Sequence, residues 1–264
     1  DGSRRGNQFR VSGSLEFPEL PSVAMDAAGN FVVTYSTINS WEGEGDWQGV
    51  GARRYRADGT PAPEGIFQVN TPYLVGRQTN PCIAMLPDGR SVIVWEDGVN
   101  DGSGTGIFAQ RYDAQGTPQG VFQVNTTTAN NQLLPSVAMD AAGNFVVVWL
   151  CDIQDGQNWT RSIMAQRYDA QGNLQGDETA LVTSPFLRKP LVVRDAAGDF
   201  VELGRGDAGA NGCGHGGDGV GQGAAERLEA VEFVFVGDGH VDFLVALGRL
   251  LVFADPAREG GEEA

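Results

Sequence analysis

One stretch of the chain decides the fold: Pro135-Ser-Val-Ala-Met-Asp-Ala-Ala-Gly-Asn-Phe-Val-Val-Val-Trp149. Copies of it start at Pro21, Pro81 and, in degraded form, Pro190, so the pattern recurs at intervals of 60, 54 and 55 residues. Self-similarity at a fixed period of this size is typical of a repeat architecture. We therefore interpret the chain as an array of four units, each of about 55 residues.

Each unit predicts four short β-strands. In the third unit they are residues 136–139, 145–149, 163–168 and 179–183, which are rich in β-branched and aromatic side chains. Asp140-Ala-Ala-Gly-Asn144 joins the first two strands and Ala170-Gln-Gly-Asn173 joins the last two. Both predict tight hairpin turns, because Asp and Asn bond their own backbone and Gly adopts positive φ without strain. The other connections are longer and differ between units.

Antiparallel strands reverse direction at every turn, so both tight turns lie at one end of a unit and the variable loops at the other. Such units arranged around an axis form a β-propeller. We expect an all-β, propeller-like domain of four four-stranded blades, with a β-sandwich as the alternative. Gln8–Ser12 matches Phe67–Thr71, a segment that ends a unit. An N-terminal strand is therefore expected to close the last blade.

Three segments carry a resemblance to a known group of proteins. They are the Val-Ala-Met-Asp-Ala-Ala-Gly-Asn-Phe stretch, Gly106-Ile-Phe-Ala-Gln-Arg-Tyr-Asp-Ala-Gln-Gly116 and Phe122-Gln-Val-Asn-Thr126. Together they resemble the tandem repeat of large secreted or surface bacterial proteins, mostly uncharacterised, which often also carry adhesion-type or calcium-binding modules. The resemblance covers residues 8–203. It implies an extracellular or cell-surface, propeller-like domain, and it brings no agreed catalytic residues.

Charge and hydropathy exclude two kinds of partner. The formal net charge is −16 over 264 residues, whereas binding to nucleic acid requires clustered Lys and Arg. No run of about 18 apolar residues could span a membrane. A strongly acidic chain suits solubility, cation binding or a basic partner. We therefore expect neither nucleic-acid binding nor membrane insertion.

The repeat pattern breaks in the middle of a predicted strand. Residues 1–203 carry the repeats, and residues 204–264 form a Gly-rich, acidic, divergent tail. Two interpretations stay open: the tail completes the fourth blade, or it derives from a shifted reading frame. Resequencing the gene distinguishes them.

The variable loops supply a candidate ligand site. Aromatic rings can stack on sugar C–H groups while carboxylates and amides bond the hydroxyls, which is the general form of a small-ligand site. The alternative is that the tryptophans fold back over blade edges. The predicted ligand-binding residues are Trp41, Asp46, Trp47, Tyr73, Asn100, Asp155, Asn158 and Trp159.

A second candidate is a calcium site. Asp101, Ser103 and Thr105 alternate with glycine, and hard cations take oxygen ligands from flexible loops. The alternative is a flexible, solvated loop. We predict no other cofactor.

Residues for catalysis are sparse. Both histidines fall in the divergent tail, which leaves no plausible Ser/His/Asp set. The carboxylate pairs Glu42/Glu44 and Asp97/Asp101 could serve a glycosidase, but nothing distinguishes them from solvated loop charges. We therefore assign no catalytic residue and expect a non-enzymatic module for binding or adhesion, with carbohydrate as the favoured ligand. The alternatives are an assembly subunit that contacts another protein and, third, a polysaccharide hydrolase.

Two recurring positions are interpreted as structural. Aromatic side chains end the second strand of successive units, which predicts packing between blades. An Arg precedes Tyr in each third strand and is also interpreted as structural. These residues are Tyr35, Trp95 and Trp149, and Arg54, Arg111 and Arg167.

Overall fold

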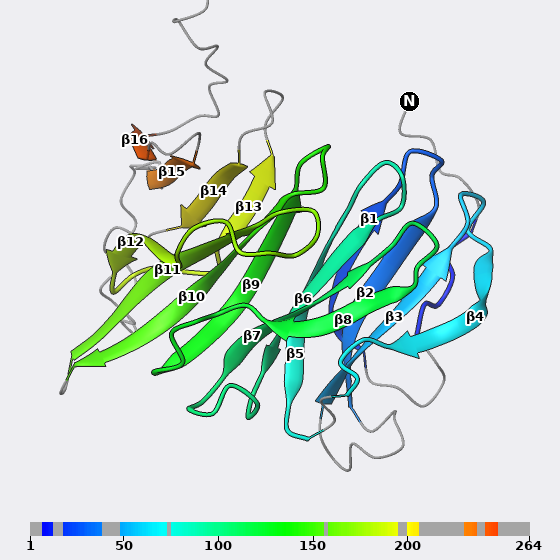
Figure 1. Ribbon diagram of the computed structural model, residues 1–264, viewed down its shortest axis with the longest axis horizontal. Coiled ribbons are helices and arrows are strands. Elements are labelled where there is room, and N and C mark those ends of the chain that lie inside the picture. The colour runs from blue at the N-terminus through cyan, green and yellow to red at the C-terminus, as the bar shows by residue number, and fades with distance from the viewer. Residues whose placement is uncertain are drawn as a thin grey trace, which may run out of the picture.

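The computed structural model describes residues 7–12, 18–38, 48–72, 75–155, 158–194, 200–205, 230–236 and 241–247. Within these residues the chain forms four antiparallel sheets of four strands each, with the strands of every sheet in sequence order (Figure 1). The described residues contain no helix, and so none that could cross a membrane. The all-β expectation is confirmed.

The first sheet comprises β1 (Glu19–Met25), β2 (Phe31–Ile38), β3 (Gln48–Tyr55) and β4 (Pro61–Gln68). The second comprises β5 (Gln78–Met85), β6 (Ser91–Asp97), β7 (Gly106–Tyr112) and β8 (Pro118–Gln123). The third comprises β9 (Asn131–Met139), β10 (Phe145–Asp155), β11 (Asn158–Tyr168) and β12 (Thr179–Ser184). The fourth comprises β13 (Leu191–Arg194), β14 (Phe200–Arg205), β15 (Ala230–Val236) and β16 (Val241–Leu247).

The tight turns form through the chemistry that the sequence predicts. In the turn between β9 and β10, Asp140 Oδ1 accepts hydrogen bonds from the backbone amides of Gly143 and Asn144, at 2.8 and 2.9 Å. Gly143 has a φ of +98°, a conformation that costs glycine little. In Figure 1 these turns lie towards the top, and the variable connections lie at the opposite end of the sheets.

The four sheets stand side by side with their first strands adjacent. β1 contacts β5, β5 contacts β9, and β9 contacts β13. Three apolar clusters fill the spaces between successive sheets. This arrangement confirms the propeller-like fold and differs from a sandwich, in which two sheets enclose one core.

Two of the three recurring aromatic residues lie in these clusters. The side chains of Trp95 and Trp149 are completely buried, and Tyr35 is buried as well. Trp95 packs in the cluster between the first and second sheets, and Trp149 in the one between the second and third. The prediction of packing between blades is confirmed for Trp95 and Trp149, whereas Tyr35 is buried but belongs to none of the three clusters.

Arginines of the third strands connect neighbouring sheets. The Arg54 guanidinium lies 4.1 Å from the Phe67 ring centroid and donates from Nη2 to the carbonyl of Gly116 in the next sheet, at 2.8 Å. Arg111 donates from Nη1 to the carbonyl of Ala170 in the third sheet, at 3.1 Å. Both arginines therefore bridge to a tight turn of the following sheet, as their structural interpretation requires.

Two details differ from the expectations. The described N-terminal residues 7–12 are not a strand of the fourth sheet; they pack on the first, where the Phe9 ring lies 5.2 Å from the Tyr55 ring. The fourth sheet takes β15 and β16 from the divergent tail instead. The third variable loop is also no open loop, because β10 and β11 continue as a ladder to the pair Asp155–Asn158.

Candidate functional site

The strongest candidate site lies at the loop end of the second sheet, where β6 finishes beside β5 and β9. Glu96 ends the apolar run of β6 and pairs in register with Thr79 of β5. Only 5% of Glu96 is exposed. A carboxylate is rarely buried to this degree without dedicated partners.

Glu96 has two hydrogen-bond donors, and both bind Oε1. The backbone amide of Leu134 donates at 2.6 Å, and Asn80 Nδ2 donates at 2.9 Å. Leu134 belongs to β9 of the third sheet, so this carboxylate joins two sheets. Neither hydrogen bond uses Oε2.

Burial raises the pKa of Glu96 above its ordinary value, because desolvation disfavours the charged form. The hydrogen bonds from Leu134 and Asn80, and the positive charges of Arg77 and Lys189, oppose that shift in part. The net direction is upward, so Glu96 retains a proton at higher pH than a solvated glutamate. This is the property of a group that donates a proton in catalysis.

Irregular first strands place these partners. Leu20, Asn80 and Leu134 each precede a proline and have φ values between 51° and 55°. At these positions the pairing with the second strand shifts register. A β-bulge re-aims side chains and amides at the rim of a sheet. Here it directs the amide of Leu134 towards Glu96.

The same contact recurs one sheet earlier with a smaller acceptor. The backbone amide of Asn80 donates to Ser36 Oγ at 3.2 Å, and Ser36 Oγ lies 3.1 Å from Thr79 Oγ1. Ser36 and Glu96 occupy equivalent positions in β2 and β6, and Leu150 holds this position in β10. The second sheet thus places a titratable group where its neighbours have a hydroxyl and an aliphatic chain.

Our sequence reasoning did not select Glu96. The available signal was a carboxylate directly after Trp95, at a strand position where the other units have Ser36 and Leu150. The sequence does not reveal that the partner amide comes from Leu134, 38 residues later.

The predicted ligand-binding residues are dispersed. Trp41, Asp46, Trp47 and Tyr73 lie outside the described residues. Asp155 ends β10, and Asn158 and Trp159 begin β11 with exposed side chains. In Figure 1 this hairpin tip lies at the margin of the molecule, away from the loop that follows β6.

Asn100, the remaining predicted ligand-binding residue, has a structural contact. Its Nδ2 donates to both carboxylate oxygens of Asp97, each at 2.8 Å. The described members of the predicted set therefore form no single cluster.

The carboxylate pair Asp97/Asp101 is bound to its own loop. Asp97 Oδ1 also accepts hydrogen bonds from the amides of Val99 and Asn100, while Asp101 Oδ1 accepts from the amides of Ser103 and Gly104. Both carboxylates are buried. Their hydrogen bonds stabilise the β6–β7 connection. The other pair, Glu42/Glu44, lies outside the described residues.

The predicted calcium residues Asp101, Ser103 and Thr105 lie in this same connection. Asp101 Oδ2 is buried without a hydrogen-bond partner, and the amide of Thr105 binds Asn131 Oδ1 at 3.3 Å. No group of three or more His, Cys, Asp or Glu occurs at metal-binding distance within the described ranges. Calcium at this loop stays a prediction.

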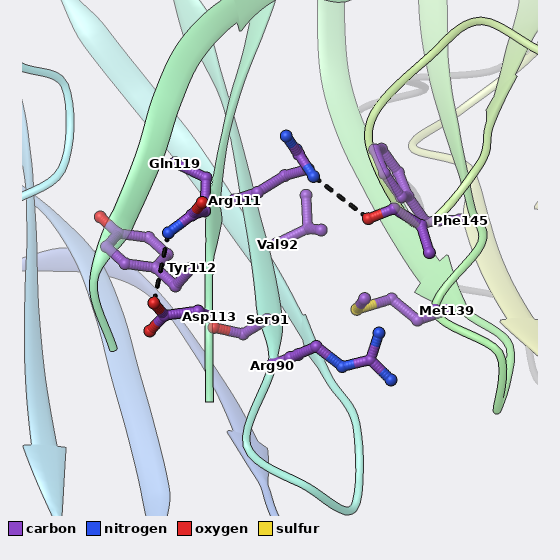
Figure 2. Close-up of a pocket in the computed structure, with 11 residues that line it drawn as sticks. Arg90, Ser91, Val92, Arg111, Tyr112, Asp113, Gln119, Met139 and Phe145 are labelled. Atoms are coloured by element: carbon purple, nitrogen blue, oxygen red, sulfur yellow. Dashed lines mark hydrogen bonds between the residues drawn. The ribbon is translucent and has the colours of Figure 1, made fainter. Parts of the chain in front are cut away.

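A small pocket of about 180 Å³ opens near the tight turns between the second and third sheets (Figure 2). Arg90, Arg111 and Phe145 are among its lining residues. Arg111 is engaged by Ala170, and Arg90 Nε pairs with Asp88 Oδ2 at 2.7 Å. The pocket includes Ser91 at the start of β6, whereas Glu96 lies near its end. It is therefore separate from the carboxylate site.

Comparison with known proteins identifies relatives by fold alone. No family model and no curated protein matches the sequence. The structure is similar to an endo-arabinase from Bacteroides thetaiotaomicron, with 15% identity, a TM-score of 0.52 and coverage of 90% of this chain and 82% of that one. It is also similar to an α-L-arabinanase from Penicillium chrysogenum complexed with arabinobiose, with 12% identity, a TM-score of 0.56 and coverage of 86% and 66%.

A third similar structure is an N-acetylgalactosamine deacetylase from F. plautii in complex with blood group B trisaccharide, with 12% identity, a TM-score of 0.50 and coverage of 89% and 71%. All three proteins are named as enzymes. This finding overturns our expectation of a non-enzymatic module. That expectation rested on the lack of a recognisable catalytic motif, but a catalytic carboxylate need not belong to a sequence motif, because the fold can assemble the site from separate units.

Proposed function

We propose that this protein hydrolyses glycosidic bonds of a polysaccharide, with Glu96 as the general acid. The observation that supports the proposal most is the buried carboxyl group of Glu96, which has a raised pKa and lies at the loop end of the second sheet. Glycosidases need one carboxyl group that stays protonated until it donates to the leaving-group oxygen. Glu96 meets that requirement through burial, and both of its hydrogen bonds are confined to Oε1.

The substrate class is proposed from the fold relatives. One similar structure contains arabinobiose and another contains a blood group trisaccharide. Sequence identities of 12–15% extend the fold to this chain and leave the substrate open. We propose a neutral polysaccharide of the arabinan type as the first substrate to test. Because polymers of this kind lie outside cells, an extracellular or cell-surface location fits the proposal.

The reaction needs a second carboxylate. Inverting glycosidases place the two carboxyl groups about 6.5–9.5 Å apart, and retaining ones about 5–5.5 Å apart. We propose Glu42, Glu44 or Asp46 for this role, because these residues follow β2 in the sequence. Ser36 of β2 contacts Thr79, and Thr79 pairs in register with Glu96. The predicted sugar-stacking residues Trp41 and Trp47 belong to the same loop.

The test is release of reducing ends from debranched arabinan, galactan and xylan by the wild-type protein and by Glu96→Gln. Glutamine keeps the shape and the acceptor oxygen of Glu96 but cannot supply the proton. Loss of general-acid catalysis should lower kcat by about 10²–10⁴-fold. Binding of the polymer should persist in the variant.

Asp152→Asn is the matched control. Asp152 is another partly buried carboxylate, and it pairs with Arg161 at 2.9 Å within the third sheet. Activity should be unchanged in this variant. Full activity in Glu96→Gln would remove Glu96 from the mechanism. If the wild-type protein also releases no reducing ends from any of the three polymers, the hydrolase proposal fails.

A further inference from the structure

Every junction between neighbouring sheets buries an equivalent apolar side chain of the following first strand. These side chains are Ile83 in β5, Val137 in β9 and Val192 in β13, and all three are buried. Each packs in the cluster that separates its sheet from the preceding one. We call the side of a sheet that faces the preceding sheet its leading face, and the side that faces the following sheet its trailing face.

No described segment covers the inner part of the leading face of the first sheet. Val23 is the residue of β1 equivalent to Ile83, and it is 61% exposed; Met25 on the same face is 59% exposed. Met85, the counterpart of Met25, packs against the cluster between the first and second sheets. The first sheet therefore carries one half of a junction without its other half.

The outer part of that face already has a cover. The Phe9 ring lies 5.2 Å from the Tyr55 ring, and the Phe122 ring of β8 lies 5.4 Å from the Tyr168 ring; both pairs are tilted. Tyr55 donates to the carbonyl of Val11 at 3.5 Å, and Tyr168 to that of Val124 at 3.2 Å. The N-terminal segment thus occupies the place that the fourth strand of a preceding sheet would take, and only the inner part around Val23 and Met25 remains open.

The trailing face of the fourth sheet is the complementary half. In the third sheet, Ala138 on the trailing face packs in the cluster with Val192. Val193 is the equivalent of Ala138 in β13 and is 39% exposed, and its neighbour Leu191 is 49% exposed. Figure 1 places the first and fourth sheets at opposite ends of the array, so these two faces do not meet within the part of the chain that the structure describes.

We infer that the protein associates head to tail, the trailing face of the fourth sheet in one copy packing on the leading face of the first sheet in a second copy. Leu191 and Val193 of one copy would cover Val23 and Met25 of the other. The contact continues the junction that already joins the sheets within the chain. Arrays of repeats need polar outer faces at their ends to stay single, whereas the described first strands at both ends here expose apolar side chains. A junction between two different faces produces rings or open chains of copies.

The experiment uses one variant for each face. Val23→Asp with Met25→Asp disables the leading face, and Leu191→Asp with Val193→Asp disables the trailing face. Sedimentation velocity over a concentration series should show wild-type protein assembling beyond one chain, and each variant alone at the mass of a single chain. An equal mixture of the two variants has one intact junction per pair. It should form a dimer and stop there.

Leu174→Asp is the matched control, because Leu174 is 54% exposed but lies in the turn after β11. This variant should assemble as the wild type does. Far-UV circular dichroism checks that all variants fold. If the aspartate variants do not fold, Val23→Thr replaces the leading-face variant and Leu191→Thr replaces the trailing-face variant. Wild-type protein that stays a single chain at every concentration overturns the inference. A mixture that forms no dimer, although the wild type assembles, overturns it as well.

Discussion

At the residue scale, single side chains determine how the sheets join. Arg54 lies over the Phe67 ring, approaches the Tyr112 ring to 5.3 Å and binds the Gly116 carbonyl. A cation between aromatic faces is worth about 0.5–2 kcal/mol, depending on its desolvation. Since Gly116 also has a φ of +81°, two independent constraints exclude a side chain there.

Gly116→Ala separates these constraints when it is compared with Gly120→Ala. A Cβ at Gly116 would lie 2.7 Å from the Arg54 guanidinium, whereas a Cβ at Gly120, with a φ of +98°, meets nothing within 4 Å. We expect both variants to lose about 1 kcal/mol through backbone strain, and Gly116→Ala to lose about 1 kcal/mol or more beyond that through the displaced arginine. Urea unfolding measures the difference. Equal losses would show that Arg54 moves aside without cost.

Glu96→Gln should change how stability depends on pH. The folded protein holds the Glu96 proton more tightly than the unfolded chain does, so the resulting stabilisation is complete below the ordinary pKa of about 4.5. It is lost as pH rises through the raised pKa of the folded state. Glutamine removes this dependence. We expect the free energy of unfolding of the variant, minus that of the wild type, to be larger at pH 7.5 than at pH 4. Urea titrations at both pH values test this. An equal difference at both pH values would contradict it.

At the element scale, the first strand of each sheet does most to connect the units. Besides its apolar residue, it exchanges hydrogen bonds across the junction: the amide of Ile83 donates to Ser22 Oγ at 3.3 Å, and the amide of Val192 donates to Ser136 Oγ at 3.1 Å. Cys82 holds the equivalent position in the second sheet. The junctions therefore differ in polarity although their apolar parts are alike.

Ser136→Ala tests the contribution of one such hydrogen bond. The variant leaves the buried amide of Val192 without its acceptor, which should cost about 1–3 kcal/mol. Hydrogen exchange at Val192 should accelerate, while exchange at Ile83 should stay unchanged because its acceptor Ser22 is intact. The same acceleration at both amides would indicate general destabilisation instead of loss of one junction.

At the scale of the whole molecule, the described sheets form an open series in which each sheet is stabilised by its neighbours. A central sheet has two junctions and an end sheet has one, so stability depends on position in the series. The second and third sheets contain the completely buried Trp95 and Trp149. We therefore expect them to be the most stable part of the described structure.

Hydrogen exchange should reveal that gradient. In the variant with a disabled leading face, where association cannot mask the ends, amides of β6 and β10 should exchange most slowly and those of β1 faster, because local opening requires fewer contacts to break at an end. Mass-spectrometric exchange of strand-length peptides resolves this difference. Uniform exchange across all the sheets would mean that the series unfolds as one cooperative unit.

Much of the fold could be predicted from the sequence, and little of the candidate site could. The turn at Asp140–Asn144 follows from a local pattern, and the burial of Trp95 follows from an aromatic position that recurs in successive units. Glu96 could not be selected in the same way, because its pKa depends on burial by a neighbouring sheet and on an amide from Leu134. The N-terminal segment does not join the fourth sheet as expected, because β15 and β16 from the divergent tail complete that sheet.

The sequence by itself determined the four-stranded units, their tight turns and the end of the sheets at which the variable loops lie. These features depend on hydrogen bonds and turn residues that are close together along the chain. Only the tertiary structure decided that the described sheets form an open series, that the first strands at its two ends expose apolar side chains, and that Glu96 is buried. Those outcomes depend on how side chains of different sheets pack together, and no repeating pattern in the sequence indicates that packing.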